Sequence, residues 1–258
     1  MAGPILVFDS GVGGLSVVAA LRRHLPDAAL AYVCDNAMLP YGTRPDAWLV
    51  ERIVAVCQAA VARAGADTLV VACNTASTLA LESLREALSI PVVGTVPAIK
   101  PAAQQSRSGH IALLATSATV SRPYTQRLID SFAPHCRVLR LAADPLVAEA
   151  EAWIRGGTLD VDVLRVALAP LAADPRLDTV VLGCTHFPLL GSALAAAAPG
   201  DYGWVDSGDA IARRTAQVAL SPDDWRGRGV SLVTGSATGL GDGFVPFGFA
   251  PPMLLRVP

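Results

Sequence analysis

The chain has 258 residues, of which 52% are hydrophobic and 16% charged, and its formal net charge is −2. This length allows two modest α/β domains or one large one, and the charge excludes the basic surface typical of nucleic-acid-binding proteins. No apolar run reaches the roughly 18 residues of a transmembrane helix, and no signal peptide precedes the first predicted strand. We therefore expect a cytoplasmic protein that binds neither membranes nor nucleic acids.

The first predicted element is a buried strand at residues 4–8, which leads through a glycine-rich turn into an amphipathic helix from residue 15. The turn begins with Asp9 and Ser10, and its three glycines lack the GxGxxG spacing of a dinucleotide site. The glycines can simply permit a tight turn. Alternatively, Asp9 and Ser10 stand beside the free N–H groups of a helix start, which is an anion-binding geometry.

Strands and helices then alternate along the chain. Strands are predicted at residues 29–33, 90–96, 110–115, 137–141 and 230–234, and helices at residues 48–64, 76–87, 145–154, 161–172 and 210–219. Residues 97–101 contain two prolines and are predicted to cross between domains. The tail from Ser221 onward is rich in glycine and proline, and we expect it to pack back on the first domain.

Three sets of polar residues could belong to a site: two follow predicted strands, and one lies on a predicted helix. Residues 40–44 are either an ordinary surface loop or one wall of a crevice. The hydroxyls of residues 116–119 are either helix caps or ligand contacts. Glu149 and Glu151 lie on the helix at residues 145–154, where carboxylates are usually solvated.

A nine-residue stretch occurs twice: residues 67–75 (DTLVVACNT) are echoed by residues 178–186 (DTVVLGCTH). Each copy has the apolar run of a strand buried on both faces, and each reaches a cysteine, Cys73 or Cys184, where the strand ends. Parallel α/β sheets bind ligands outside the carboxyl ends of their strands. The two cysteines are therefore expected to approach one site from two sides.

This order of elements predicts an α/β protein of two similar domains, each with a mostly parallel sheet flanked by helices. The domains are expected to be related by a pseudo-twofold axis, with the active site between them. We assign residues 1–97 and 206–258 to the first domain and residues 98–205 to the second.

Two thiols on opposite walls of a cleft suit racemisation by two bases, in which a proton leaves one face of a carbon and another arrives at the opposite face. A helix N-terminus or a cationic neighbour lowers the pKa of a thiol, so one cysteine can be thiolate while the other is thiol. His186 and Asp9 are the expected partners of the thiols. A single cysteine after a buried strand is ordinarily a core residue, but two in matched contexts favour function.

Four motifs in register resemble those of the glutamate racemases, within the aspartate/glutamate racemase superfamily. They occupy residues 8–15 (FDSGVGGL), 40–44 (PYGTR), 72–77 (ACNTAS) and 183–190 (GCTHFPLL). The resemblance implies a cofactor-independent enzyme that interconverts L- and D-glutamate, the D-isomer serving peptidoglycan synthesis.

The same resemblance implies roles for individual residues. It makes Cys73 and Cys184 the two proton-transfer residues, with Asp9 and His186 assisting and Glu151 as a further assisting acid. The substrate contacts that it implies are Asp9, Ser10, Pro40, Tyr41, Gly42, Asn74, Thr75, Thr119, Thr185 and His186.

Partners also follow from the resemblance. Residues 97–102 are similar to the form found in a proteobacterial branch whose members can require a peptidoglycan precursor as activator. We expect a homodimer or a monomer–dimer equilibrium. The five cysteines have no CxxC spacing and the four histidines no paired spacing, so no metal site is expected.

Three alternatives differ in testable ways. An aspartate racemase typically carries an acidic residue where His186 stands and lacks the motif at residues 8–15. An amino-acid-binding module would bind its ligand without turnover, even after loss of both thiols. A pyridoxal-phosphate racemase would need Lys100, the only lysine, which lies between prolines in the predicted crossing segment.

Overall fold

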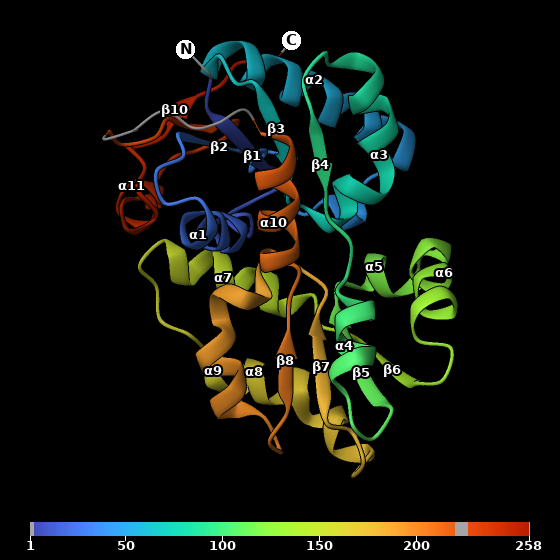
Figure 1. The fold of residues 1–258 in the computed structure, drawn as a ribbon. Coiled ribbons are helices and arrows are strands. Elements are labelled where there is room, and N and C mark those ends of the chain that lie inside the picture. The colour runs from blue at the N-terminus through green and yellow to red at the C-terminus, as the bar shows by residue number, and fades with distance from the viewer. Residues whose placement is uncertain (1–2, 220–226, 258) are drawn as a thin grey trace.

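The structure is a computed structural model that describes residues 3–219 and 227–257. Its strands form two parallel sheets in separate lobes (Figure 1). The six-stranded lobe has the order β10-β9-β2-β1-β3-β4, and the four-stranded lobe has the order β6-β5-β7-β8. The strands are β1 (Ile5–Asp9), β2 (Leu30–Cys34), β3 (Thr68–Val71), β4 (Val92–Gly94), β5 (His110–Ala115), β6 (Arg137–Ala142), β7 (Thr179–Leu182), β8 (Gly203–Val205), β9 (Ser231–Val233) and β10 (Met253–Leu254).

Helices cover the faces of both sheets. Those of the six-stranded lobe are α1 (Leu15–His24), α2 (Asp46–Ala64), α3 (Asn74–Ala87), α10 (Gly208–Val218) and α11 (Leu240–Phe244), with short 3-10 turns η1 (Tyr41–Thr43) and η4 (Val245–Phe247). Those of the four-stranded lobe are α4 (Ile99–Gln105), α5 (Ser117–Ser121), α6 (Pro123–Phe132), α7 (Pro145–Ile154), α8 (Val161–Leu168) and α9 (Gly191–Ala197), with η2 (Ala169–Ala173) and η3 (Phe187–Leu190). Among the described residues, no helix is long and apolar enough to cross a membrane.

Each sheet is buried on both faces, which explains its continuous apolar runs. Along β1, Ile5 and Val7 belong to the core beneath α1 and α10, whereas Leu6 and Phe8 belong to the core beneath α2 and α3. Successive side chains of a strand point to opposite faces, so one run of four apolar residues serves two cores. The four-stranded sheet is built in the same way.

The two lobes repeat one topology. In the six-stranded lobe β1 lies between β2 and β3, and β4 follows β3; in the four-stranded lobe β5 lies between β6 and β7, and β8 follows β7. The two copies of the nine-residue repeat thus supply β3 and β7, at equivalent places. The predicted fold class is confirmed. The predicted domain limits, 1–97 with 206–258 and 98–205, stay a prediction, and the strands of the two sheets fall on the two sides of those limits.

Several element boundaries differ from the sequence expectation. Helix α3 begins at Asn74 and not at residue 76, because Cys73 is its N-cap. The helix expected at residues 161–172 ends at Leu168 and continues as the 3-10 turn η2, since Pro170 has no N–H for the α-helical ladder. The crossing segment at residues 97–101 already contains the start of α4, where Pro101 occupies the first turn and leaves no helical hydrogen bond unmade.

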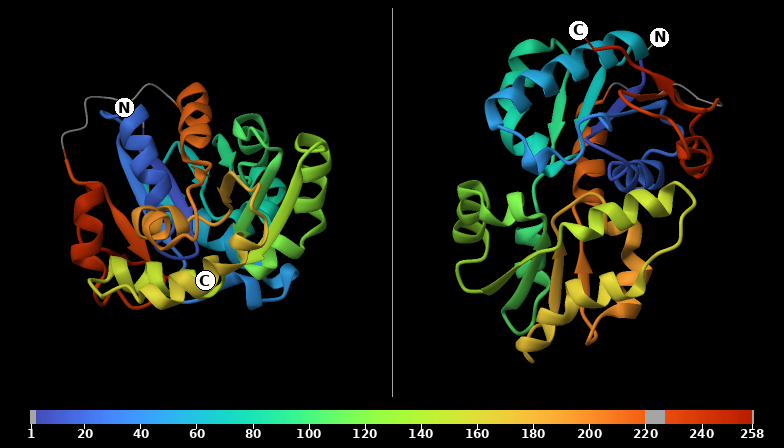
Figure 2. Two further views of the ribbon diagram at one scale, coloured as in Figure 1. Left: turned by 90° about the horizontal axis from the view of Figure 1, so that it is seen from below. Right: turned by 180° about the vertical axis from the view of Figure 1, so that it is seen from behind.

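The tail completes the six-stranded lobe. The expected strand at residues 230–234 is β9, which pairs with β2, and the sequence analysis missed β10 and α11. Residues 221–226 lie outside the described part of the chain. Figure 2 shows the red C-terminal segment on the six-stranded lobe, and α11 contacts α7 of the other lobe. The tail therefore packs back on the first sheet, as expected, and also reaches the second lobe.

Candidate active site

A cavity of about 460 Å³ lies where the carboxyl ends of strands from both sheets meet. Its walls come from the β1 turn, the 3-10 turn η1 and the segments that follow β3, β5 and β7. All the residues expected at the site except Asp9 line this cavity: Ser10, Pro40, Tyr41, Gly42, Cys73, Asn74, Thr75, Thr119, Glu151, Cys184, Thr185 and His186. The structure thus brings together residues from four separate motifs.

Cys73 stands at the N-terminus of α3 and is 6% exposed. Its Sγ lies 3.6 Å from the hydroxyl of Ser10, and the backbone N–H of Ala76 also points to the thiol. Burial and the nearby Asp9 carboxylate raise the pKa of Cys73 to about 12. The expectation that a helix start lowers the pKa of a thiol is therefore wrong for Cys73, because desolvation outweighs the helix N–H groups.

Cys184 has a different neighbour. Its Sγ lies 3.7 Å from Nδ1 of His186, and Nε2 of that ring lies 3.0 Å from Oε1 of Glu151. Burial opposes protonation of His186, but the contacts with Cys184 and Glu151 outweigh it and raise the pKa of the imidazole well above its ordinary value. A protonated ring donates from both nitrogens, so it binds the thiol and the carboxylate together.

Glu151 joins the two lobes. Its Oε1 accepts 2.7 Å and 3.0 Å bonds from the backbone N–H of Val12, in the β1 turn, and from His186. Burial raises the pKa of Glu151, but the bonds from His186 and Val12 overcome this and lower it below its ordinary value. The general rule that a carboxylate on a helix is solvated is wrong here, since Glu151 is 8% exposed.

Asp9 lies behind the cavity wall and is fully buried. One carboxylate oxygen accepts from the backbone N–H of Gly11 at 3.0 Å, and the other accepts from the Thr185 hydroxyl at 2.9 Å. Burial raises the pKa of Asp9, only partly opposed by His186. Asp9 therefore connects the Ser10 side of the site with the Cys184 side from beneath.

One polar atom at the cavity has no partner. Asn74 is 7% exposed, and its side-chain oxygen Oδ1 makes no hydrogen bond to any described residue. A buried acceptor without a partner is unfavourable. Asn74 lines the cavity, so a bound donor such as an ammonium group is a suitable partner for this oxygen.

The loop that carries Pro40 and Gly42 is held from outside the cavity. The Tyr41 hydroxyl donates to Oδ2 of the buried Asp35 at 2.8 Å. Arg52 donates to both oxygens of the same carboxylate, at 3.0 and 2.7 Å. Tyr41 thus anchors the loop through its phenol, and Gly42 closely approaches Ala118 of the other lobe.

Comparison with known proteins places this site in a family. The family described as Asp/Glu/Hydantoin racemase matches residues 15–215. The glutamate racemase of Pectobacterium carotovorum subsp. carotovorum (strain PC1) is 50% identical over 221 residues, which are 85% of this chain and 78% of that protein. The chain belongs to the Asp/Glu/hydantoin racemase family. The resemblance to the glutamate racemases that the four motifs indicated is confirmed.

Solved structures of racemases agree with this membership. A crystal structure of Escherichia coli glutamate racemase in complex with L-glutamate and activator UDP-MurNAc-Ala is 42% identical, with a TM-score of 0.95 and 100% of each chain covered. Glutamate racemase from Thermus thermophilus, in complex with β-chloro-D-alanine, is 35% identical with a TM-score of 0.76, covering 99% of this chain and 96% of the other. An aspartate racemase homologue from Pyrococcus horikoshii shares the fold at 16% identity.

Part of the cavity lining was not expected from the sequence, namely Leu39, Asp144, Val147 and Ala148. Thr43, Thr116 and Ser117 also line it, which favours a crevice wall for residues 40–44 and ligand contacts for residues 116–119, and Gly183 lines it from the fourth motif. Asp144 follows the end of β6, so the strand-end rule that found Cys73 could also have found it. Val147 and Ala148 lie one turn before Glu151 on the same helix face, which the helical period indicates.

Proposed function

We propose that the chain racemises glutamate without a cofactor, with Cys73 and Cys184 as its two bases. The observation that carries the proposal is that the repeated strands β3 and β7 deliver both thiols to one cavity. The high identity to curated glutamate racemases, about 50%, supports glutamate as the substrate. In cells that build peptidoglycan, the product D-glutamate would enter its synthesis, in the cytoplasm.

The reaction needs only proton transfers. The thiolate of one cysteine takes the α-proton, and the C–H electron pair passes into the α-carboxylate. The thiol of the other cysteine then donates its proton to the opposite face of the carbon. The first cysteine ends as a thiol and the second as a thiolate, so the enzyme is ready for the reverse reaction.

Charge that develops on the α-carboxylate needs fixed donors. The free N–H groups at the start of α3 and the hydroxyls of Ser10 and Thr75 line the cavity and can donate, whereas the Thr185 hydroxyl already donates to Asp9. Each preorganised donor in a site that excludes water contributes a few kcal/mol to the stability of such a transition state. The partnerless Oδ1 of Asn74 suits the substrate ammonium, and Thr119 with the loop of Pro40 and Gly42 would contact the side-chain end.

The assisting groups differ between the two thiols. A protonated His186, held by Glu151, can return a proton to Cys184 through the 3.7 Å contact. On the other side, the Ser10 hydroxyl accepts from the Cys73 thiol and can donate to its thiolate. Asp9 fixes Thr185 and the β1 turn, so its proposed role is to orient donors on both sides.

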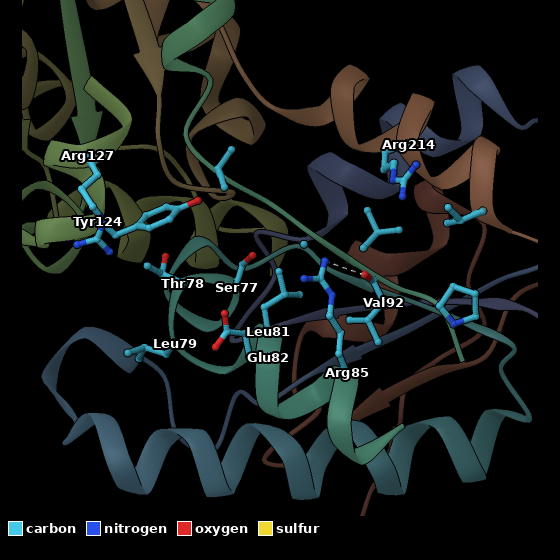
Figure 3. A pocket seen from close by; sticks show the side chains of 15 residues that line it. Ser77, Thr78, Leu79, Leu81, Glu82, Arg85, Val92, Tyr124, Arg127 and Arg214 are labelled. Atoms are coloured by element: carbon cyan, nitrogen blue, oxygen red, sulfur yellow. Dashed lines mark hydrogen bonds between the residues drawn. The ribbon is translucent and has the colours of Figure 1, made fainter. Parts of the chain in front are cut away.

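We further propose that an anionic activator derived from a peptidoglycan precursor binds a second cavity, of about 930 Å³, between α3, β4, α6 and α10 (Figure 3). Its lining includes Arg85, Arg127, Arg214 and Tyr124. Guanidinium groups bind phosphate oxygens in pairs, and a tyrosine ring stacks on a base. Because α6 belongs to the four-stranded lobe and α3 to the other, a ligand here would hold the lobes together. Whether the chain also forms a homodimer stays a prediction.

Exchange of the substrate α-hydrogen in D₂O tests the two-base assignment. The unaltered chain should racemise L-glutamate, followed by circular dichroism. Cys73→Ser should lose exchange from one enantiomer and Cys184→Ser from the other, since each remaining thiol works on one face. Equal exchange from both enantiomers in either variant would contradict the assignment of Cys73 and Cys184 as the two bases. Binding of glutamate without turnover in the unaltered chain would favour the amino-acid-binding module.

A further inference from the structure

Residues 234–239, which we call the tail segment, contact two groups of residues that support the active site. This segment follows β9 and precedes α11. It lies beyond residue 215, where the match to the family ends. None of its residues lines the active-site cavity, yet it bonds to groups that hold both sides of that cavity.

The first contact supports the loop that carries Pro40 and Gly42. The Thr234 hydroxyl donates to Oδ1 of Asp35 at 2.5 Å, on the carboxylate that also accepts from Tyr41. The same hydroxyl oxygen accepts from the backbone N–H of Ala37 at 3.2 Å. Loss of this hydroxyl would leave the buried Asp35 carboxylate with one partner fewer, immediately before the loop.

The side chain of Asn36 strengthens this contact. Its amide nitrogen donates to the Ser236 carbonyl and its amide oxygen accepts from the Gly235 backbone N–H, both at 2.8 Å. The tail segment is therefore bonded to three consecutive residues, 35–37, that lead from β2 into the substrate loop. A segment bonded in this way restricts where the loop can begin.

The second contact supports the Cys184 side. Nη1 of Arg155 donates to the backbone carbonyl of Thr238 at 2.7 Å, and its Nη2 lies 3.5 Å from Oε2 of Glu151. Glu151 in turn holds His186 against Cys184. Arg155 ends α7, in the four-stranded lobe, so this contact joins the tail to the opposite lobe.

Backbone geometry at Gly239 fits this close approach. Gly239 has φ of +74°, in the left-handed region that favours glycine. A Cβ atom added there would lie 3.2 Å from Cβ of Arg155 and 3.3 Å from its carbonyl oxygen. The segment therefore passes directly over the end of α7, and a larger residue would push it away.

We propose that the tail segment is a common brace that positions the substrate loop through Asp35 and the Cys184 side through Arg155 and Glu151. The inference rests on the proposed function, because it assigns positioning residues to the same site. Thr234 and Arg155 are positioning residues, since neither touches the cavity. The two arms act on different steps: one on how the substrate is held, the other on one of the two proton transfers.

Amide exchange tests the loop arm without any substrate. In Thr234→Val, the backbone amides of Leu39 and of residues 41–44 should exchange with D₂O about fivefold faster than in the unaltered chain. Thr215→Val is the control for the same substitution, because the Thr215 hydroxyl is buried and bonds only to the carbonyl of Ile211 in its own helix. If Thr234→Val fails to fold, Asn36→Ala is the second variant, because it removes the two bonds between Asn36, at the surface, and the tail segment. Unchanged exchange of these loop amides in both Thr234→Val and Asn36→Ala would overturn this arm.

Kinetics give the same arm a second readout. Thr234→Val should raise KM for both enantiomers about three- to tenfold with kcat changed less than about twofold, and Thr234→Ser should restore KM. A purely structural role would lower Tm and leave KM unchanged. Failure of the chain to racemise glutamate would overturn the proposed function, and the amide exchange would still decide on the brace.

The Arg155 arm is tested in single-thiol backgrounds. In Cys73→Ser, where Cys184 works alone, adding Arg155→Met should lower α-hydrogen exchange about tenfold. In Cys184→Ser, the same change should leave the Cys73-dependent exchange unaltered. Arg165→Met, which removes an exposed arginine of α8, is the control. An equal loss in both backgrounds, or no loss in either, would overturn this arm.

Discussion

Glu151 provides a quantitative test of the buried network, through the substitution Glu151→Gln. Glutamine keeps the oxygen that accepts from Val12 and His186, at 2.7 and 3.0 Å, and removes only the negative charge. Hydrogen bonds to charged groups contribute about 1.5–3 kcal/mol and neutral ones about 0.5–1.5 kcal/mol. We therefore expect the variant to lose about 1–2 kcal/mol of unfolding free energy, or roughly 2–8 °C in Tm for a chain of this size.

The pH dependence of this loss follows from the directions of the two pKa shifts. The pKa of His186 is raised in the folded state, so its contribution is complete below its ordinary value of 6.5 and is lost as pH rises through the folded value. The pKa of Glu151 is lowered, so its contribution is complete above its ordinary value of 4.5 and is lost as pH falls through the folded value. Both contributions are therefore complete between pH 4.5 and 6.5.

Thermal unfolding followed by circular dichroism at several pH values measures this prediction. The difference in Tm between the unaltered chain and Glu151→Gln should be largest near pH 5–6 and should shrink as pH rises toward 9. An exposed pair such as Arg165 with Asp162 provides a control, because its removal should change Tm little. A Tm difference that stays flat or grows between pH 6 and pH 9 would refute the assigned pair of Glu151 and a protonated His186.

Three further substitutions test other parts of the site. Asp9→Asn should raise the unfolding free energy at pH 8, because burial raises the pKa of Asp9 and the carboxylate form is unfavourable there. The same change should lower kcat by on the order of tenfold or more. Lower stability at pH 8 in denaturant unfolding would contradict this. Gly13→Ala should lower kcat by on the order of 100-fold in a folded chain, since its Cβ would collide with the His186 ring; racemisation at the unaltered rate would exclude the collision. Arg122→Met removes the paired bonds to Asp46, at 3.0 and 3.1 Å, that join the two lobes. KM should rise about twofold to fivefold, while Tm should change by less than about 4 °C because Asp46 is largely exposed. An unchanged KM would show that this pair does not help to close the cleft.

The strand-end part of the site could be predicted from the sequence. Buried parallel strands are recognisable as short valine-rich runs, and the residue after such a run must stand at the carboxyl edge of the sheet. That rule placed Asp9 and Cys73 near one another, and the 3.6 Å contact of Cys73 with Ser10 is a local consequence of it. Bringing Cys184 to the same site also required the expectation that two similar domains face each other.

The contacts of Glu151 could not be predicted in the same way. They join Glu151 to Val12, 139 residues away, and to His186, 35 residues away. No local pattern on α7 distinguishes Glu151 from Glu149, which is partly exposed and accepts from the backbone of Asp160. The contact with His186 forms when α7 packs on the segment after β7, and the contact with Val12 forms only when the two lobes meet. Both are tertiary effects that helical periodicity does not contain.

Part of the tail could be predicted, since the strand expected at residues 230–234 is β9. Strand β10 escaped prediction because it has only two residues and depends on pairing with β9, some twenty residues earlier in the chain. Such a strand has no apolar period long enough to recognise. The glycines that mark this region as irregular, Gly239 among them, are the positions that let the tail approach α7 closely.

The repeat makes the two thiols topologically equivalent, but the residues outside the repeat make their surroundings different. Cys73 contacts the neutral hydroxyl of Ser10 and lies near the buried Asp9 carboxylate. Cys184 instead contacts the imidazole of His186, whose pKa is raised. L- and D-glutamate are mirror images of equal free energy, so kcat/KM must be the same in the two directions, however unequal the thiols are. The asymmetry of the site must therefore appear in kcat and KM separately. The direction in which the proton is harder to remove should have the lower kcat and, in proportion, the lower KM.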